Sequence, residues 1–128
     1  MQEKNNPLSP HLQIYRWQIS SLLSITHRIV GVINILAISA ICFWSLFLLL
    51  GAESYEVLNN FFNSFFGKFI AVGLCWTFSF HILNELRHLF WDMGYGFDLK
   101  ISRTTGVLAL VGSFVLTILF YLIGKNIF

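Results

Sequence analysis

Three long runs of apolar residues, separated by short polar segments, dominate this chain of 128 residues. The first has no charged side chain between residues 29 and 51, and the third is equally clean up to Lys125. About 20 helical residues cross the hydrocarbon layer of a bilayer, and none of the runs alternates as a barrel strand would. The pattern predicts an all-α integral membrane protein with three transmembrane helices, at about 21–51, 62–90 and 105–124.

The first 20 residues differ from these runs. They begin MQEKNNPLSP, which lacks the apolar core of a signal peptide and the Arg-rich pattern of a presequence. Ser9 followed by Pro10 is typical of a helix start. We therefore expect a short interfacial segment within residues 1–20, either a membrane-surface anchor or a docking strip for a soluble partner. Its shared face would carry Leu12, Tyr15 and Ile19. Residues 1–128 are expected to form a single membrane-anchor domain.

Composition supports the membrane assignment. Hydrophobic residues make up 56% of the chain and charged residues 11%, against about 25% charged in a soluble domain. This argues against a soluble enzyme, and the net charge of +2 is too small for a nucleic-acid-binding protein. Cys42 and Cys75 lie inside apolar runs, and the sequence has neither CxxC nor CxxCH. Thiol redox chemistry and covalent c-type haem are therefore poor interpretations.

The basic residues are distributed unequally between the two ends of the predicted spans. Six of them flank the start of the first span or the loop between the second and third, and two lie on the other side. By the positive-inside rule, the N-terminus is cytoplasmic and the C-terminus is periplasmic. The six are Lys4, Arg16, Arg28, Arg87, Lys100 and Arg103, and the two are Lys68 and Lys125.

A first polar cluster lies at the start of the first span. Ser24, His27 and Arg28 fall within one helical turn of each other, so a hydroxyl, an imidazole and a guanidinium share one face. The ordinary interpretation is a capping serine and an arginine that extends to lipid phosphates. The alternative is a site for an anionic or carbonyl-bearing ligand.

A second polar cluster lies at the end of the second span. His81 and His88 are seven residues apart, or about 10 Å along a helix, which is too far for both to bind one metal ion. No HExxH motif is present, and the sequence lacks the pair of ExxH motifs that a di-iron centre uses. An imidazole at the depth of His81 either bonds to a neighbouring helix or binds a ligand, and the residue pattern leaves both open. Glu85 and Arg87 are two residues apart and do not face each other on a helix, so each needs another partner.

Haem b would use such a histidine, since its iron takes an imidazole and its propionates need cations near the polar boundary. The cations at His27 and Arg28 lie on the expected cytoplasmic side of His81. We expect no second histidine at the depth of His81, so the iron would be five-coordinate or would take its other ligand from another subunit. Two other classes remain open: a haemless structural or assembly protein, and a small channel.

Three motifs together resemble the larger cytochrome b membrane anchor of succinate dehydrogenase, the succinate:ubiquinone oxidoreductase of respiratory complex II. They are PLSPHLQIYRW (7–17), SITHRIVG (24–31) and HILNELRHLFWDMGY (81–95). The resemblance covers nearly the whole chain. It implies three spans in a helical bundle with a smaller second anchor subunit, together with an iron–sulfur subunit and a flavoprotein subunit. The N-terminal form is similar to alphaproteobacterial and mitochondrial members, which implies a bacterial inner membrane, or alternatively a mitochondrial one.

The resemblance also implies roles for single residues. His81 matches the axial ligand of haem b, with the opposing histidine supplied by the smaller anchor subunit. His27 and Arg28 match residues beside the haem propionates, and Ser24 with Arg28 matches the ubiquinone contacts. The cytoplasmic end of the second helix, facing the iron–sulfur subunit, is matched by Arg87, His88 and Asp92.

One position departs from the family. Where many relatives have small residues, often ending in Gly, this chain has Asn84 and Glu85. A carboxylate there is expected to crowd or retune the site. The implied function is to pass electrons from iron–sulfur clusters to ubiquinone in the respiratory chain and tricarboxylic acid cycle, with no dehydrogenase activity of the chain alone. An anchor of a quinol:fumarate reductase is the close alternative.

Overall fold

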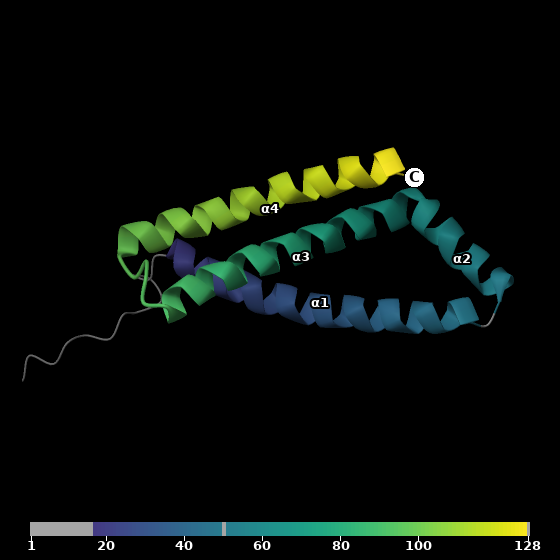
Figure 1. The fold of residues 1–128 in the computed structure, drawn as a ribbon, viewed down its shortest axis with the longest axis horizontal. Helices are drawn as coiled ribbons and strands as arrows, with labels where there is room; N and C mark the ends of the chain where they lie inside the picture. Colours follow the sequence, from purple (N-terminus) through teal and green to yellow (C-terminus); the bar gives the residue numbers. More distant parts are fainter. Residues whose placement is uncertain (1–16, 50, 128) are drawn as a thin grey trace, which may run out of the picture.

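A computed structural model describes residues 17–49 and 51–127 of the chain. It contains four helices: α1 (Ile19–Leu49), α2 (Ala52–Asn63), α3 (Phe65–Asp92) and α4 (Leu99–Ile127) (Figure 1). Within the described residues, α1, α3 and α4 are each long and apolar enough to cross a membrane. The predicted all-α fold with three spans is thereby confirmed. The expected interfacial face at Leu12 and Tyr15, with the start at Ser9 and Pro10, lies outside the described residues.

The helix boundaries differ from the expected ranges at two places. Residues 52–63 form the separate helix α2, and α3 begins at Phe65 rather than near residue 62. The break is at Ser64, whose backbone is extended and whose hydroxyl accepts a hydrogen bond from the backbone N–H of Gly67 at 3.1 Å. This is an N-cap, which satisfies one of the free donors at the start of α3. At the other end of the fold, α4 begins at Leu99, six residues before the apolar run at 105.

Figure 1 shows α3 lying between α1 and α4, with α2 crossing from the end of α1 to the start of α3. The start of α1, the end of α3 and the start of α4 therefore lie together at one end of the molecule. The end of α4 lies at the other end, as α2 does. Most large apolar side chains are exposed on the outside, as expected for helices surrounded by lipid or by other membrane helices.

The turn between α3 and α4 depends on a glycine. Gly94 has φ +86°, a left-handed conformation that residues with a side chain rarely adopt. Its N–H donates to the Trp91 carbonyl at 2.9 Å, and the Tyr95 N–H donates to the Phe90 carbonyl at 3.0 Å. These two bonds form a Schellman motif, which satisfies the last carbonyls of α3 and ends the helix. The chain can then reverse into α4.

Small residues allow α4 to approach its neighbours closely. Gly106, Ala109, Ser113 and Thr117 are all buried along one face, the spacing typical of close membrane helix contacts. A Cβ at Gly106 would overlap the side chain of Leu23 on α1. The partner of this stripe is thus within the chain itself.

Arg87 fastens the end of α3 to the start of α4. Its guanidinium donates to the Ser102 carbonyl at 2.8 Å, to the Ser102 hydroxyl at 3.0 Å and to the Thr105 hydroxyl at 3.2 Å. It also lies 4.1 Å from the centre of the Trp91 ring. Arg87 is only 7% exposed. The Arg87 side chain is therefore directed into the bundle, where α4 supplies the hydrogen-bond partners that hydrocarbon lacks. That the cytoplasmic end of α3 faces an iron–sulfur subunit stays a prediction.

We expect Arg87→Ala to destabilise the bundle by about 1–3 kcal/mol, because the charge-assisted bonds to α4 are lost. The measurement is thermal unfolding of the purified complex in detergent. Arg103→Ala is the matched control, since Arg103 is an exposed arginine on α4 next to Ser102, the residue that Arg87 contacts. An equal loss of stability in both variants would contradict the role given to Arg87.

Candidate functional site

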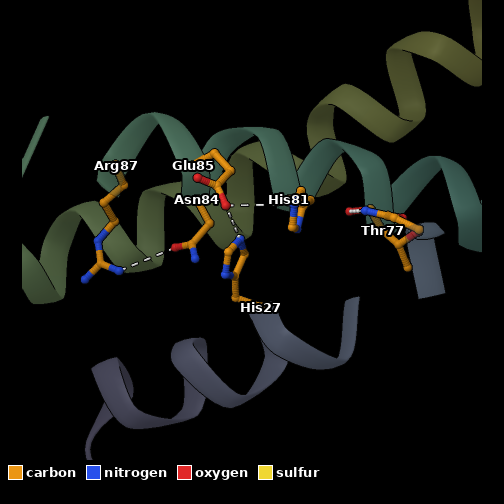
Figure 2. A network of polar contacts seen from close by, with 7 residues as sticks. His27, Thr77, His81, Asn84, Glu85 and Arg87 are labelled. Carbon is orange, nitrogen blue, oxygen red and sulfur yellow. Dashed lines mark hydrogen bonds and ion pairs between the residues drawn. The ribbon is translucent and has the colours of Figure 1, made fainter. Parts of the chain in front are cut away.

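Two histidines from different helices meet near the end of the bundle where the chain turns between α3 and α4. The rings of His27 on α1 and His81 on α3 stack with their centres 4.4 Å apart and their planes 14° from parallel (Figure 2). The expectation that no other histidine lies at the depth of His81 is therefore wrong. His27 stood near the predicted helix boundary, but α1 begins eight residues earlier, at Ile19, and crosses α3 at this point.

Glu85 completes the cluster. Its Oε1 atom lies 3.0 Å from His27 Nε2 and 3.9 Å from His81 Nε2, as the dashed lines in Figure 2 show. Both are carboxylate–imidazole contacts at ion-pair distance, and His27 Nε2 has no hydrogen-bond partner among the described residues. Two imidazoles and a carboxylate thus place three possible ligand atoms within 4.8 Å of one another.

A glycine gives the His81 ring its room. A Cβ built on Gly31 of α1 would lie 3.4 Å from His81 Cε1, so a larger side chain there would press on the imidazole. One turn further along α1, the buried Asn34 side chain donates to the Thr77 carbonyl at 3.4 Å. These close approaches set the depth at which α1 and α3 cross.

One nitrogen of His81, Nε2, is open to a ligand. Nδ1 is buried without a hydrogen-bond partner, and Nε2 has only the carboxylate at 3.9 Å. The side chain is 31% exposed, so one edge of the ring faces out of the chain. A buried polar atom without a partner is costly, but Nδ1 is closed off from an outside ligand, so a ligand or a second subunit would contact the exposed edge of the ring.

Ser24 and Arg28 are both exposed on α1, whereas the His27 side chain is turned inward and 17% exposed. The expected single face of three polar groups is thus divided between α3 and the outside. No hydrogen bond or ion pair holds the Arg28 guanidinium within residues 17–49 and 51–127. The pair of Ser24 and Arg28 is available to a ligand or to a neighbouring subunit.

The remaining residues of the second predicted cluster point in different directions. Asn84 is 1% exposed, and its Oδ1 accepts a hydrogen bond from the Arg87 guanidinium at 3.4 Å (Figure 2). The His88 ring lies 5.2 Å from the His27 ring and 5.2 Å from the Trp91 ring. Asp92 is exposed at the last residue of α3.

Sequence reasoning missed two members of this site. Nothing in the sequence marked Gly31, because its importance depends on the His81 ring that α3 places next to it. Glu85 was noted as unusual, and its spacing of four from His81 placed both on one face of a helix, but its contact with His27 depends on how α1 and α3 cross.

Comparisons of the sequence with known proteins identify a family. Residues 2–120 match the model of the succinate dehydrogenase/fumarate reductase transmembrane subunit. The chain belongs to this family. The succinate dehydrogenase cytochrome b556 subunit of Rickettsia felis is 42% identical over 115 residues, covering 90% of each chain. That of Paracoccus denitrificans is 34% identical, over 90% of this chain and 88% of the relative. The cytochrome b560 subunit of Reclinomonas americana is 35% identical, with 93% and 86% covered.

The family confirms the resemblance drawn from the three motifs. The chain is a multi-pass membrane protein of the cytochrome b anchor type, a subunit of an enzyme complex. The relatives are named as b-type cytochromes.

Proposed function

We propose that this chain is the haem-binding, quinone-reducing anchor of a succinate:ubiquinone oxidoreductase, and that His81 is its axial ligand to haem b. The observation that carries the proposal is the His81 ring, which is held between helices yet has one exposed edge and no hydrogen bond to either nitrogen. An imidazole nitrogen of this kind is what haem iron binds. Gly31, which leaves space beside the ring, fits the same role.

The residues on the proposed cytoplasmic side of His81 suit the haem propionates and ubiquinone. His27 and Arg28 are the groups we assign to the haem propionates, since a positive charge or an N–H donor stabilises a carboxylate at the polar boundary. Ser24 and Arg28 are the groups we assign to ubiquinone. The hydroxyl and the guanidinium would orient the quinone carbonyl and stabilise negative charge that develops on its oxygen during reduction.

The proposal includes partner subunits. The smaller membrane anchor would supply the second axial ligand, so that one haem b is shared between two chains. Electrons would arrive from the iron–sulfur subunit, which receives them from the flavoprotein subunit. The bound haem would accept and release single electrons near the quinone. Residues 1–128 would act as one membrane-anchor domain in contact with lipid and with these partners.

Two other functions each have an observation in their favour. The matching family includes fumarate reductase, so an anchor for a quinol:fumarate reductase is an alternative whose direction the soluble subunits would decide. A haemless structural or assembly role is favoured by the His27–Glu85 contact at 3.0 Å, because this contact joins α1 to α3 without any ligand. A purified complex without b-type absorbance would support the haemless role.

We expect His81→Leu to abolish the b-type spectrum of the purified complex while the chain still inserts in the membrane, because the iron loses its ligand. The measurement is reduced-minus-oxidised absorbance together with immunodetection of the chain. His88→Leu is the comparison on the same helix and should keep its haem. Haem content equal to wild type in the His81 variant would place the ligand elsewhere.

Arg28→Leu is expected to slow succinate-to-ubiquinone turnover at least about tenfold, since a charged hydrogen-bond donor to the reacting oxygen is removed. Succinate oxidation with a soluble dye acceptor should stay near wild type, because it bypasses the quinone. The control is Arg103→Leu, an exposed arginine at the same end of the bundle. Normal quinone turnover in the Arg28 variant would remove this residue from the proposed quinone site.

For localisation we propose a bacterial inner membrane, with the N-terminus cytoplasmic and the C-terminus periplasmic, and a mitochondrial inner membrane as the alternative. The end of the bundle where α1 starts and α4 starts (Figure 1) carries Arg87, Lys100 and Arg103. The opposite end has Lys68 and Lys125. This asymmetry follows the positive-inside rule.

A C-terminal alkaline phosphatase fusion is therefore expected to be active in a bacterial host, since phosphatase folds only in the periplasm, and a C-terminal green fluorescent protein fusion should be dark. Equal expression of both fusions, checked by immunoblot, is the control. The reverse pattern of activity would show that the chain inserts with the opposite orientation.

A further inference from the structure

Glu85 is the acidic side chain that contacts the histidine pair. It lies four residues after His81, so both side chains project from the same face of α3 one turn apart. The side chain is 55% exposed, on the same edge of the bundle from which His81 faces outward. The carboxylate oxygen Oε1 lies 3.9 Å from His81 Nε2.

The charge of this carboxylate is not neutralised by a nearby cation. Its contacts within the described residues are the two imidazoles, at 3.0 and 3.9 Å. The guanidinium closest in sequence, Arg87, turns away and donates to Ser102 and Thr105 on α4 (Figure 2 shows Glu85 and Arg87 pointing in different directions). Glu85 lies within α3, a helix long and apolar enough to cross a membrane, and a charge in such a low-dielectric environment is weakly screened.

The same carboxylate also contacts His27. Its Oε1 atom lies 3.0 Å from His27 Nε2, and the His27 ring stacks on the His81 ring with the centres 4.4 Å apart. A group that fixes the orientation of a residue next to a metal ligand alters the ligand's surroundings as well as its charge. Glu85 therefore has two routes to influence whatever His81 binds.

We propose that Glu85 is a positioning and charge-setting residue that lowers the midpoint potential of the haem in this chain. The inference rests on the proposed function, since it requires haem on His81. A negative charge beside the iron stabilises the ferric form relative to the ferrous form, which carries one positive charge less, so reduction becomes harder. The carboxylate does not transfer electrons. It acts on the haem by the electrostatic effect of its charge and, indirectly, through its contact with His27.

The test is a potentiometric titration of the b-type absorbance in the purified complex. Glu85→Gln keeps the size and the polar contacts of the side chain but removes its charge, and we expect its midpoint potential to shift upward with haem content unchanged. Glu85→Asp keeps the charge and should stay closer to wild type. The control is Glu56→Gln on α2, an exposed carboxylate at the opposite end of the molecule (Figure 1), which should not move the potential.

A Glu85→Gln complex that holds haem at the wild-type potential would overturn this proposal and leave the proposed function intact. Loss of haem from Glu85→Gln, with or without loss from Glu85→Asp, would also overturn it, since Glu85 would then be needed to retain haem rather than to tune it. Absence of b-type absorbance from the wild-type complex would instead contradict the proposed function itself.

Discussion

The crossing of α1 and α3 at the stacked rings of His27 and His81 organises this molecule. A lipid environment gives polar side chains no solvent partner, so each must find one on another helix or on a ligand. Gly31 lets the helices approach, and Glu85 bridges the imidazoles at 3.0 and 3.9 Å. The cluster still leaves nitrogens without hydrogen bonds. That remaining deficit is the physical reason to assign a ligand to this site.

Helix α3 divides its polar residues between two tasks. His81, Glu85 and His88 follow one stripe with the spacing i, i+4, i+7 and gather around His27. The adjacent stripe, Phe80, Asn84 and Arg87, is buried, and its last two members join the helix to α4 through the hydrogen bonds of Arg87. The buried stripe thus stabilises the packing of α3 on α4, and the stripe with the two histidines and Glu85 forms the candidate site. This arrangement explains how a chain with so few charged residues can place several of them within one end of the bundle.

Much of the fold could be predicted from the sequence, because membrane spans are determined by local composition. Three apolar runs identified α1, α3 and α4, and the motifs identified the family. The separate helix α2 escaped prediction, since its break depends on the cap at Ser64. The direction of Arg87 and the meeting of His27 with His81 also escaped prediction. Both depend on how the helices cross, and periodicity within one helix carries no information on the register between two.

The account depends most on His81 sharing a haem with a neighbouring subunit. An electron cryo-microscopy map of the intact complex, purified in mild detergent, would address it directly. The account predicts density from His81 continuous with a porphyrin that is ligated on its other face by the smaller anchor subunit. A map in which His81 remained stacked on His27 and next to Glu85, with no porphyrin beside it, would contradict the account.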